Sequence, residues 1–306
     1  MNHQNAGVHA IVVTYNPDWT ILREELLLVS PQVQHLWVID NASTQPLQDR
    51  LAGLQLGEQL QCVQLPVNVG LGAAQNVGIT HARGAGATHL LILDQDSQPM
   101  SDMVQRLLAA SDQLQSAGVH VAAVAPVYAD TAEGVGSGFV RLGWLDYKRQ
   151  ADKPDHEFVM VDFFISSGSL MLVSALDDIG PMDESLFIDH VDTEWCLRAK
   201  YKGYKLFGVP RARMVHNLGD KRMRIWFLRW RNVPYHSSFR YYYILRNGLL
   251  LQKRSYIPLK WKTAELYRCF RMLGYYGLLG KDAKARRQMM RQGLIDGLRG
   301  VSGPIA

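Results

Sequence analysis

Short apolar runs alternate with amphipathic segments through the first two thirds of the chain. Each run is too short for a helix and is bounded by Gly, Pro or polar residues. Such runs are typical of strands buried on both faces of a parallel sheet. The alternation with helical patterns predicts an α/β fold, with a mostly parallel central sheet flanked by helices. The predicted strands are residues 8–14, 35–40, 60–65, 88–93, 120–125, 158–165, 170–173 and 205–209, and the predicted helices include residues 19–29 and 102–115.

The last third of the chain has a different pattern. From Lys221 onward, aromatic and aliphatic residues are interleaved with Lys and Arg, and the segment is predicted to be helical. We therefore divide the chain into an α/β domain, residues 1–218, and a basic, largely helical C-terminal extension, residues 219–306. Two interpretations of the extension stay open: helices that lie in a membrane interface, and helices packed on the domain with a solvated basic face. Residues 126–157, rich in Gly and charge, are predicted to be loop.

Charge is distributed unevenly along the chain. Residues 1–140 hold 4 basic and 12 acidic residues, a net charge of −8, whereas residues 141–306 hold 29 and 16, a net charge of +13. A basic C-terminal third suggests an anionic partner, such as a phospholipid surface, a lipid pyrophosphate or nucleic acid. The three cysteines are far apart and form no C-x-x-C, which argues for a reducing compartment and against a zinc site. The sequence shows no signal peptide and no apolar stretch long enough to span a bilayer.

The clearest chemical signal is a pair of carboxylates at the end of a predicted strand. Leu90–Leu93 runs directly into Asp94 and Asp96, which are followed by Ser97. Ligands of open α/β sheets bind outside the carboxyl ends of the strands, and side chains two apart on an extended chain point the same way. Both carboxylates can therefore face one Mg²⁺ or Mn²⁺, shared with substrate phosphates. Taken alone, a D-x-D of this kind is more often a solvated turn.

Polar residues follow several other predicted strands, and each has a structural alternative. Asp40, at the end of the second strand, can accept a base N–H or cap a helix, and the glycine-rich segment containing Asn68 and Asn76 can hold a ligand or simply form a tight loop. Asp192 lies near the start of a predicted helix, where acid is favoured with or without a chemical role. A single histidine such as His216 is more often structural than a ligand. The first strand is not followed by glycines, which disfavours a dinucleotide-binding dehydrogenase.

These segments, taken in order, resemble glycosyltransferase family 2, the inverting nucleotide-sugar transferases of GT-A fold. The resemblance covers roughly residues 8–218 and is strong because all of its segments occur at matching spacing. The matching segments are Val13-Thr14-Tyr15-Asn16, Asp40-Asn41-Ala42-Ser43, Asn68-Val69-Gly70 with Asn76-Val77-Gly78, Leu93-Asp94-Gln95-Asp96-Ser97, and the acidic helix at Asp192. The string from Phe187 to Arg198 looks like the rhamnosyltransferase branch, in which a Val also stands at position 191 where many members have Glu.

The resemblance implies a role for each of these residues. Asp192 occupies the position of the catalytic base, and His216 matches a position that approaches metal or diphosphate. The donor-site residues are Tyr15 and Asp40 at the nucleotide base, Asn68 and Asn76 in the glycine loop, Asp94 near the ribose and metal, and Asp96 on the metal. Val191 leaves one acid fewer beside the base. Lys and Arg residues such as Arg222 or Arg240 could assist the diphosphate.

The sequence therefore predicts a metal-dependent inverting glycosyltransferase that uses Mg²⁺ or Mn²⁺. The favoured donor is dTDP-L-rhamnose, and the acceptor is a hydroxyl of a cell-surface polysaccharide precursor such as an O-antigen, linked to a lipid pyrophosphate. We expect a cytoplasmic protein in peripheral contact with the anionic inner face of the cytoplasmic membrane, and no nucleic-acid partner. The alternatives are a UDP- or GDP-sugar donor, and a non-enzymatic protein that binds anions or membranes. A sugar-nucleotide pyrophosphorylase is disfavoured, because residues 14–17 lack the glycine-rich, basic loop of that class.

Overall fold

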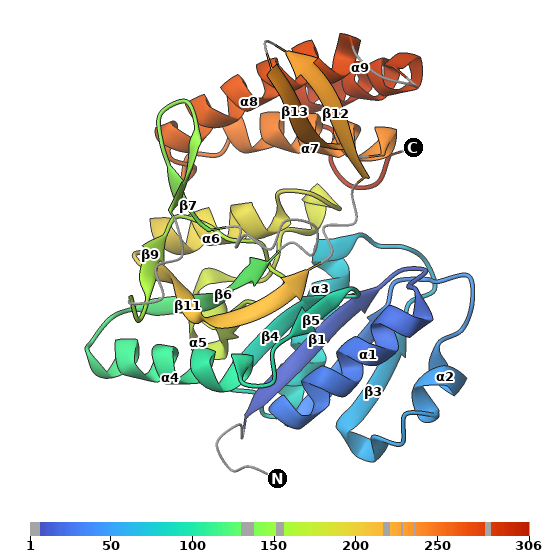
Figure 1. Ribbon diagram of the computed structural model, residues 1–306, viewed down its shortest axis with the longest axis vertical. Helices are drawn as coiled ribbons and strands as arrows, with labels where there is room; N and C mark the ends of the chain where they lie inside the picture. Colours follow the sequence, from blue (N-terminus) through green and yellow to red (C-terminus); the bar gives the residue numbers. More distant parts are fainter. Residues whose placement is uncertain are drawn as a thin grey trace.

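The protein is described by a computed structural model that covers residues 7–129, 138–150, 156–216, 221–227, 229–235, 237–278 and 283–305. Figure 1 shows a sheet with flanking helices in its lower part and a group of long helices above it. The sheet belongs to the predicted α/β domain and the upper helices to the predicted extension. The boundary predicted at residue 218 falls on residues 217–220, which lie outside the described residues.

The described residues form a nine-stranded mixed sheet in the order β3-β2-β1-β4-β10-β6-β11-β5, with β9 paired to β11. The pairs β1–β2, β1–β4, β2–β3 and β6–β11 are parallel, and β10 lies antiparallel between β4 and β6. The strands are β1 (Val8–Thr14), β2 (His35–Asp40), β3 (Leu60–Gln64), β4 (His89–Asp94), β5 (Ser97–Pro99), β6 (Val121–Ala129), β9 (Val159–Val161), β10 (Leu170–Leu172) and β11 (Lys205–His216). The predicted α/β class with a mostly parallel core is confirmed.

The central strands lie in the middle of the hydrophobic core. Every residue of β1 is buried, and Leu90–Leu93 of β4 are fully buried, because helices cover both faces of the sheet. The flanking helices are α1 (Trp19–Val29), α2 (Gln48–Ala52), α3 (Leu71–Gly84), α4 (Met103–Ser116), α5 (Val173–Ile179) and α6 (Val191–Tyr201). Asp18 caps α1 by accepting from the N–H of Thr20, as its residue type favours.

The sheet register brings polar residues of three strands to one edge. Thr14 is paired with Asp40, and Val13 with Asp94, so β1, β2 and β4 end at the same level. Parallel strands place their carboxyl ends on the same side of a sheet, where ligands of α/β proteins bind. Asp40 and Asp94, two of the predicted site residues, therefore lie at the same end of the sheet.

The C-terminal extension is largely helical, as predicted. It contains α7 (Ser238–Gln252), α8 (Leu259–Leu278) and α9 (Ala283–Arg299), which lie together above α6 in Figure 1. Helix α7 is the buried member of the group: Tyr241, Tyr242, Tyr243 and Leu245 are fully buried. Across the described residues, we find no helix that combines the length and the apolar character needed to span a bilayer.

The prediction of helix directly after Lys221 is wrong. Residues 221–235 form a hairpin of two antiparallel strands, β12 (Lys221–Phe227) and β13 (Arg229–Tyr235), with Trp226 opposite Trp230. The physical reason is visible in the sequence, since Arg222, Met223, Arg224 and Ile225 alternate with the period of a strand. Pro234 would also be costly inside a helix.

Three other boundaries differ from prediction. Within the predicted loop 126–157, β6 continues to Ala129, and β7 (Phe139–Leu142) pairs with β8 (Tyr147–Gln150) in a hairpin, while residues 130–137 and 151–155 lie outside the described part. The strand predicted at 158–165 is only β9, since residues 166–169 turn directly back into β10. Strand β11 extends beyond residue 209 to His216, because its far end finds a partner in β5.

Candidate active site

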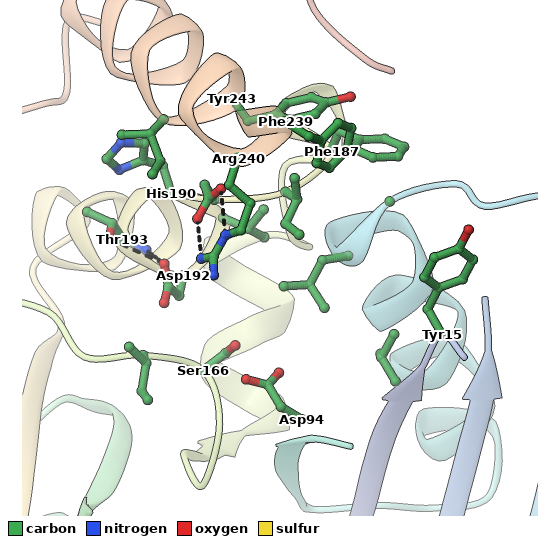
Figure 2. Close-up of a pocket in the computed structure, with 18 of the residues that line it drawn as sticks. Tyr15, Asp94, Ser166, Phe187, His190, Asp192, Thr193, Phe239, Arg240 and Tyr243 are labelled. Carbon is green, nitrogen blue, oxygen red and sulfur yellow. Dashed lines mark hydrogen bonds and ion pairs between the residues drawn. The ribbon is translucent and has the colours of Figure 1, made fainter. Parts of the chain in front are cut away.

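A cavity of about 990 Å³ lies between the carboxyl ends of the strands and the helices of the extension. Figure 2 shows Tyr15 and Asp94 on the strand side of this cavity, Asp192 and His190 near α6, and Arg240 and Tyr243 reaching in from α7. Of the predicted site residues, five line the cavity: Tyr15, Asn68, Asp94, Asp96 and Asp192. Asp40 and Asn76 do not.

The two carboxylates of the D-x-D segment lie at the strand end as predicted. Asp94 is the last residue of β4, and its N–H donates to the Ser167 hydroxyl at 3.2 Å. Ser97, which follows Asp96, is fully buried with its hydroxyl 2.6 Å from that of Ser167. The hydroxyls of Ser97 and Ser167 therefore hold the D-x-D segment in place on its buried side. Asp94 and Asp96 both line the cavity.

A third carboxyl group lies beneath the D-x-D segment. Glu25 of α1 is fully buried, and its carboxyl group lies beside the backbone N–H of Ser97, which favours the ionised form. Burial, and then the negative charges of Asp94 and Asp96, raise the pKa of Glu25 well above its ordinary value. The rise comes mainly from burial, and the two aspartate charges add to it, so the Glu25 carboxyl favours its neutral form beneath Asp94 and Asp96.

The described side chains fit a metal that is coordinated jointly by the protein and a bound ligand, and not one coordinated by protein side chains alone. They contain no group of three His, Cys, Asp or Glu side chains arranged to hold an ion. Two carboxylates beside a ligand phosphate are the usual setting of Mg²⁺, which keeps several non-protein oxygens. The backbone of His216 pairs with Ser97, next to the D-x-D segment, but its side chain lies outside the described part, so its metal role stays a prediction.

Two loops form the strand side of the cavity. The N–H of Tyr15, a half-exposed residue, donates to Oε1 of Gln95 at 2.8 Å, which ties the end of β1 to the D-x-D segment. The amide oxygen of Asn68 accepts from Gly70 and from the Asn41 side chain, at 3.0 and 3.1 Å. Buried Asn41 in turn accepts from the N–H of Val69 at 2.9 Å. Asn41 and Asn68 therefore hold the glycine loop in shape at the cavity wall.

Asp40 and Asn76 have other surroundings. Asp40 is buried under the cavity, and its Oδ1 accepts from the hydroxyl and N–H of Ser43, while Oδ2 has no partner among the described side chains. A buried carboxylate oxygen without a partner is a plausible acceptor for a ligand N–H. Asn76 points away from the cavity: its amide bonds with the backbone of Met182 and with Glu184. Asn76 therefore joins α3 to the segment that follows α5.

Asp192 lies in the first turn of α6 and faces the cavity. Its Oδ1 accepts from the N–H of Thr193 at 2.6 Å, which fixes the carboxylate relative to the helix. Burial raises the pKa of Asp192, the Thr193 N–H opposes this rise, and the charge of Asp94 adds to it. A carboxylate with a raised pKa is a stronger base than an ordinary aspartate, as proton abstraction requires.

The extension supplies charged groups to the cavity: Arg240, which the sequence named as a candidate for the diphosphate, and Glu265 and Arg268, which it did not name. Arg240 of α7 pairs with Asp189, with Nη2 at 2.7 Å from Oδ1, as the dashed lines of Figure 2 show. Glu265 of α8 is fully buried and accepts from Tyr147 at 2.6 Å and from Arg268 at 2.6 and 2.8 Å. Burial alone would raise the pKa of Glu265, but Arg268 and His190 outweigh it and hold that pKa well below its ordinary value.

An aromatic wall completes the cavity on the extension side. Phe187 stacks on Tyr243 with ring centroids 5.2 Å apart, Phe239 meets Tyr243 edge to face, and Trp261 lies edge to face with His190. Aromatic faces beside planar polar groups are suited to a ligand with both apolar and hydroxyl-bearing surfaces. In the sequence, aromatic residues near Arg240 were visible, but nothing connected them with residues 187–192.

The two sides of the cavity meet where Gly70 contacts Phe187. Gly70 has a φ of +89°, and a Cβ added there would lie 2.6 Å from the Phe187 ring. The N–H of Leu71 donates to the carbonyl of Phe187 at 2.6 Å. The glycine loop and the segment before Asp192 are thus in direct backbone contact, which only a residue without a side chain permits here.

This fold and this cavity define a glycosyltransferase of GT-A type. Residues 10–180 match Glycosyl transferase family 2, and the chain belongs to that family. Family membership decides against the alternative of a non-enzymatic anion-binding protein. Along its length, the chain is similar to the dTDP-rhamnosyl transferase RfbF of Shigella flexneri, with 30% identity over 302 residues that cover 98% of both proteins.

Solved structures share the fold at low sequence identity. The structure of S. aureus TarS 1-349 in complex with UDP-GlcNAc has a TM-score of 0.60 and 15% identity, and the match covers 96% of this chain and 81% of that one. The structure of GalNAc-T7 with UDP, GalNAc and Mn²⁺ has a TM-score of 0.58 and 16% identity, covering 88% of this chain and 56% of that one. This chain therefore spans little more than half of GalNAc-T7. At these identities both matches establish the fold alone.

Proposed function

We propose that the protein transfers L-rhamnose from dTDP-L-rhamnose to a hydroxyl of a cell-surface polysaccharide precursor, with inversion at the anomeric carbon. The observation that carries the transfer reaction is the presence of Asp192 in the same cavity as Asp94 and Asp96. The choice of rhamnose is supported by the 30% identity to a dTDP-rhamnosyl transferase over nearly the whole chain.

In this mechanism each side of the cavity has one task. Asp192 accepts the proton of the acceptor hydroxyl as that oxygen attacks the anomeric carbon from the face opposite the nucleotide. The bond between the anomeric carbon and the diphosphate oxygen breaks, and its electron pair leaves with the dTDP. Tyr15 and Asp40 contact the base, and the loop held by Asn68 approaches the ribose or phosphate. Asn76, on the helix that follows this loop, ties α3 to Met182 and Glu184.

A divalent cation fits the acidic end of the sheet. Asp96 and Asp94 are the residues that would hold Mg²⁺ or Mn²⁺, with His216 as a further candidate ligand. Such a metal would supply positive charge to balance the negative charge that develops on the leaving diphosphate. Asp94 and Asp96 both line the cavity at the carboxyl end of β4, which supports this placement. Arg240 and Arg268 are cationic side chains of the extension that line the same cavity.

Calorimetric titration with dTDP, UDP and GDP, each with and without Mg²⁺ or Mn²⁺, tests the donor assignment. We expect metal-dependent binding in which dTDP is preferred. Preference for UDP or GDP would leave the assignment as a glycosyltransferase unchanged. It would replace dTDP-L-rhamnose by a UDP- or GDP-sugar as the donor. Absence of binding to all three by folded protein would contradict the proposed function itself.

The acceptor is proposed to be linked to a lipid pyrophosphate at the inner face of the cytoplasmic membrane. Support comes from the exposed side of α8, where Leu266 and Phe270 are 49% and 74% exposed beside Arg271. The turn between β7 and β8 adds Trp144, 57% exposed, with Lys260 over its ring. Apolar and aromatic side chains flanked by cations suit an anionic bilayer surface, and each nearby cation contributes about 1 kcal/mol.

This membrane contact predicts binding to vesicles. The protein is expected to sediment with anionic liposomes at low salt and less with neutral ones. Phe270→Ser combined with Leu266→Ser should reduce sedimentation without lowering the melting temperature, since both side chains are largely exposed. Leu28→Ser, on the exposed side of α1, is the matched control and should leave sedimentation unchanged. Equal sedimentation of the double variant and the wild type would refute this surface.

A further inference from the structure

The segment that leads into Asp192 has an unfavourable backbone. Three of its residues have a positive φ: 63° at Phe187, 63° at Asp189 and 64° at His190. These values lie in the left-handed region, which residues other than glycine rarely adopt. For a bulky residue such as Phe187 this conformation is a genuine outlier. Such a backbone persists only when the surrounding structure holds it in place. The groups that hold residues 187–190, which we call the catalytic loop, therefore matter for the position of Asp192.

One amide side chain lies against three carbonyls in and directly before this loop. Asn247 of α7 is fully buried, and its Nδ2 lies within hydrogen-bond distance of the carbonyls of Leu186, Ile188 and Asp189, at 2.9, 2.8 and 3.0 Å. These carbonyls point in one direction because the left-handed residues between them turn the chain. An amide nitrogen among three carbonyls specifies this backbone arrangement, since any other course would leave buried polar groups unpaired.

The neighbouring residue anchors Asn247 itself. Arg246 is fully buried, and its Nε donates to Oδ1 of Asn247 at 2.9 Å. Nη2 of Arg246 donates to the carbonyl of Leu186 at 3.0 Å, and Nη1 donates to the carbonyl of Gly303. The guanidinium also lies over the Tyr243 ring, 4.6 Å from its centroid. The amide of Asn247 is thus fixed in the orientation that presents its nitrogen to the catalytic loop.

Side chains of the loop are held from the same helices. Asp189 pairs with Arg240 of α7 at 2.7 Å, and the His190 ring lies 3.3 Å from Glu265 and 3.1 Å from Arg268 of α8. His190 is also the N-cap residue of α6, directly before the turn that carries Asp192. Backbone and side chains of the loop are therefore both held by the extension, whereas Asp192 itself belongs to the α/β domain.

We propose that Asn247, oriented by Arg246, is a positioning residue for the transfer reaction: it sets the catalytic loop and thereby the place of the Asp192 carboxylate. This inference rests on the proposed function, because it presupposes Asp192 as the base. Asn247 touches no reacting atom and does not line the cavity. It acts on the catalytic step through the three carbonyls, and nucleotide binding depends on other groups.

The nucleotide side offers a matched control. Asn41 is likewise a buried asparagine, and it holds the glycine loop through Val69, Asn68 and Gly70 as Asn247 holds the catalytic loop. Leu is close to Asn in size and cannot make these bonds. Asn247→Leu should affect the reaction step, and Asn41→Leu should affect nucleotide affinity. The two variants remove the same kind of side chain from opposite sides of one cavity.

The test compares kcat, KM and nucleotide affinity in these variants. For Asn247→Leu we expect kcat to fall by about 100-fold, the typical consequence of a misplaced catalytic group, while the calorimetric Kd for dTDP with Mg²⁺ changes less than about twofold. Asn41→Leu should show the reverse, with Kd raised more than kcat is lowered. Asn247→Asp keeps the oxygen that Arg246 binds and loses the amide donor, so its kcat should fall as well.

A purely structural role of Asn247 would give a different result. Leu251→Ala, one turn further along α7 and fully buried, lowers stability without touching the catalytic loop and should retain kcat in the folded fraction. Wild-type kcat in folded Asn247→Leu and Asn247→Asp would overturn the proposal, as would equal losses of kcat and nucleotide affinity. Failure of the proposed function is seen separately, as absence of transfer by the wild type. If Asn247→Leu does not fold, the same measurements of kcat, KM and nucleotide affinity on Asn247→Asp test the proposal.

Discussion

Replacing Asp192 by Asn is expected to lower the rate of sugar transfer by about 10²- to 10⁴-fold, the usual contribution of a general base. Asn has nearly the same size and can still accept from the Thr193 N–H, so the start of α6 should persist. It cannot take a proton from the acceptor hydroxyl. Initial rates with saturating donor and acceptor, measured on a variant with wild-type circular dichroism, test this expectation.

Binding of the nucleotide separates the base role from a general defect. Asp192→Asn should bind dTDP with Mg²⁺ or Mn²⁺ as the wild type does, or somewhat more tightly, because a negative charge near Asp94 has been removed. Asp178→Asn, an exposed acid close in the sequence, should change neither rate nor affinity. A rate within a few-fold of the wild type in Asp192→Asn would remove Asp192 from the base role.

The pH dependence of the wild type should report the same group. Burial raises the pKa of Asp192, so the carboxylate is protonated at a higher pH than an ordinary aspartate, whose pKa is about 3.9. The base must be ionised to act, and kcat/KM should therefore fall on the acid side through a pKa above that ordinary value. In Asp192→Asn this acid limb should be absent from the residual activity. An acid limb at the ordinary aspartate pKa would contradict this assignment.

Replacing Asp96 by Ala is expected to weaken metal-dependent nucleotide binding by about 100-fold or more. Loss of even an indirect metal contact typically costs 10- to 100-fold in metal affinity, and Asp96 is proposed as a direct ligand. The described residues provide no third carboxylate, cysteine or histidine arranged to take over the ion. Titration of dTDP at several Mg²⁺ and Mn²⁺ concentrations measures the effect, and turnover should fall with it.

We expect the melting temperature of Asp96→Ala to change much less than its metal-dependent nucleotide binding. Burial keeps the Glu25 carboxyl in its neutral form and the charge of Asp96 only adds to that effect, so the loss of Asp96 should leave the melting temperature close to that of the wild type. Asp102→Ala is a suitable control, since Asp102 forms an exposed pair with Arg106 and does not line the cavity. If metal dependence persists unchanged in Asp96→Ala, the D-x-D segment is not the metal site.

The parts of the site that follow from local pattern could be predicted. Asp94 and Asp40 were expected at strand ends because Leu90–Leu93 and the run before Asp40 are continuous apolar segments of strand length, and the structure ends β4 and β2 at these residues. Asp192 was expected near a helix start for a similar reason. In each case the information lies within a few residues of the position itself, which is the range over which apolar periodicity acts.

The other half of the cavity depends on contacts that have no local pattern. Glu265 and Asn247 lie more than 50 residues beyond the catalytic loop, and only tertiary packing brings them to His190 and Ile188. One signal was present: Arg246 and Asn247 interrupt an otherwise apolar and aromatic helix, and polar residues buried in such a helix must find partners. Asn76 was assigned to the donor site from its motif alone, yet its amide faces Met182.

The contacts around Gly303 have a consequence for the timing of biosynthesis. Gly303 donates to the carbonyl of Ser185 at 2.7 Å and accepts from Arg246, so a late part of the chain closes the region directly before the catalytic loop. On a translating ribosome the α/β domain emerges first and has its sheet complete by residue 216. The remaining stretch to residue 303 takes roughly 5–15 s to synthesise. During that interval we expect a nascent protein that can already bind nucleotide sugar but does not yet transfer it.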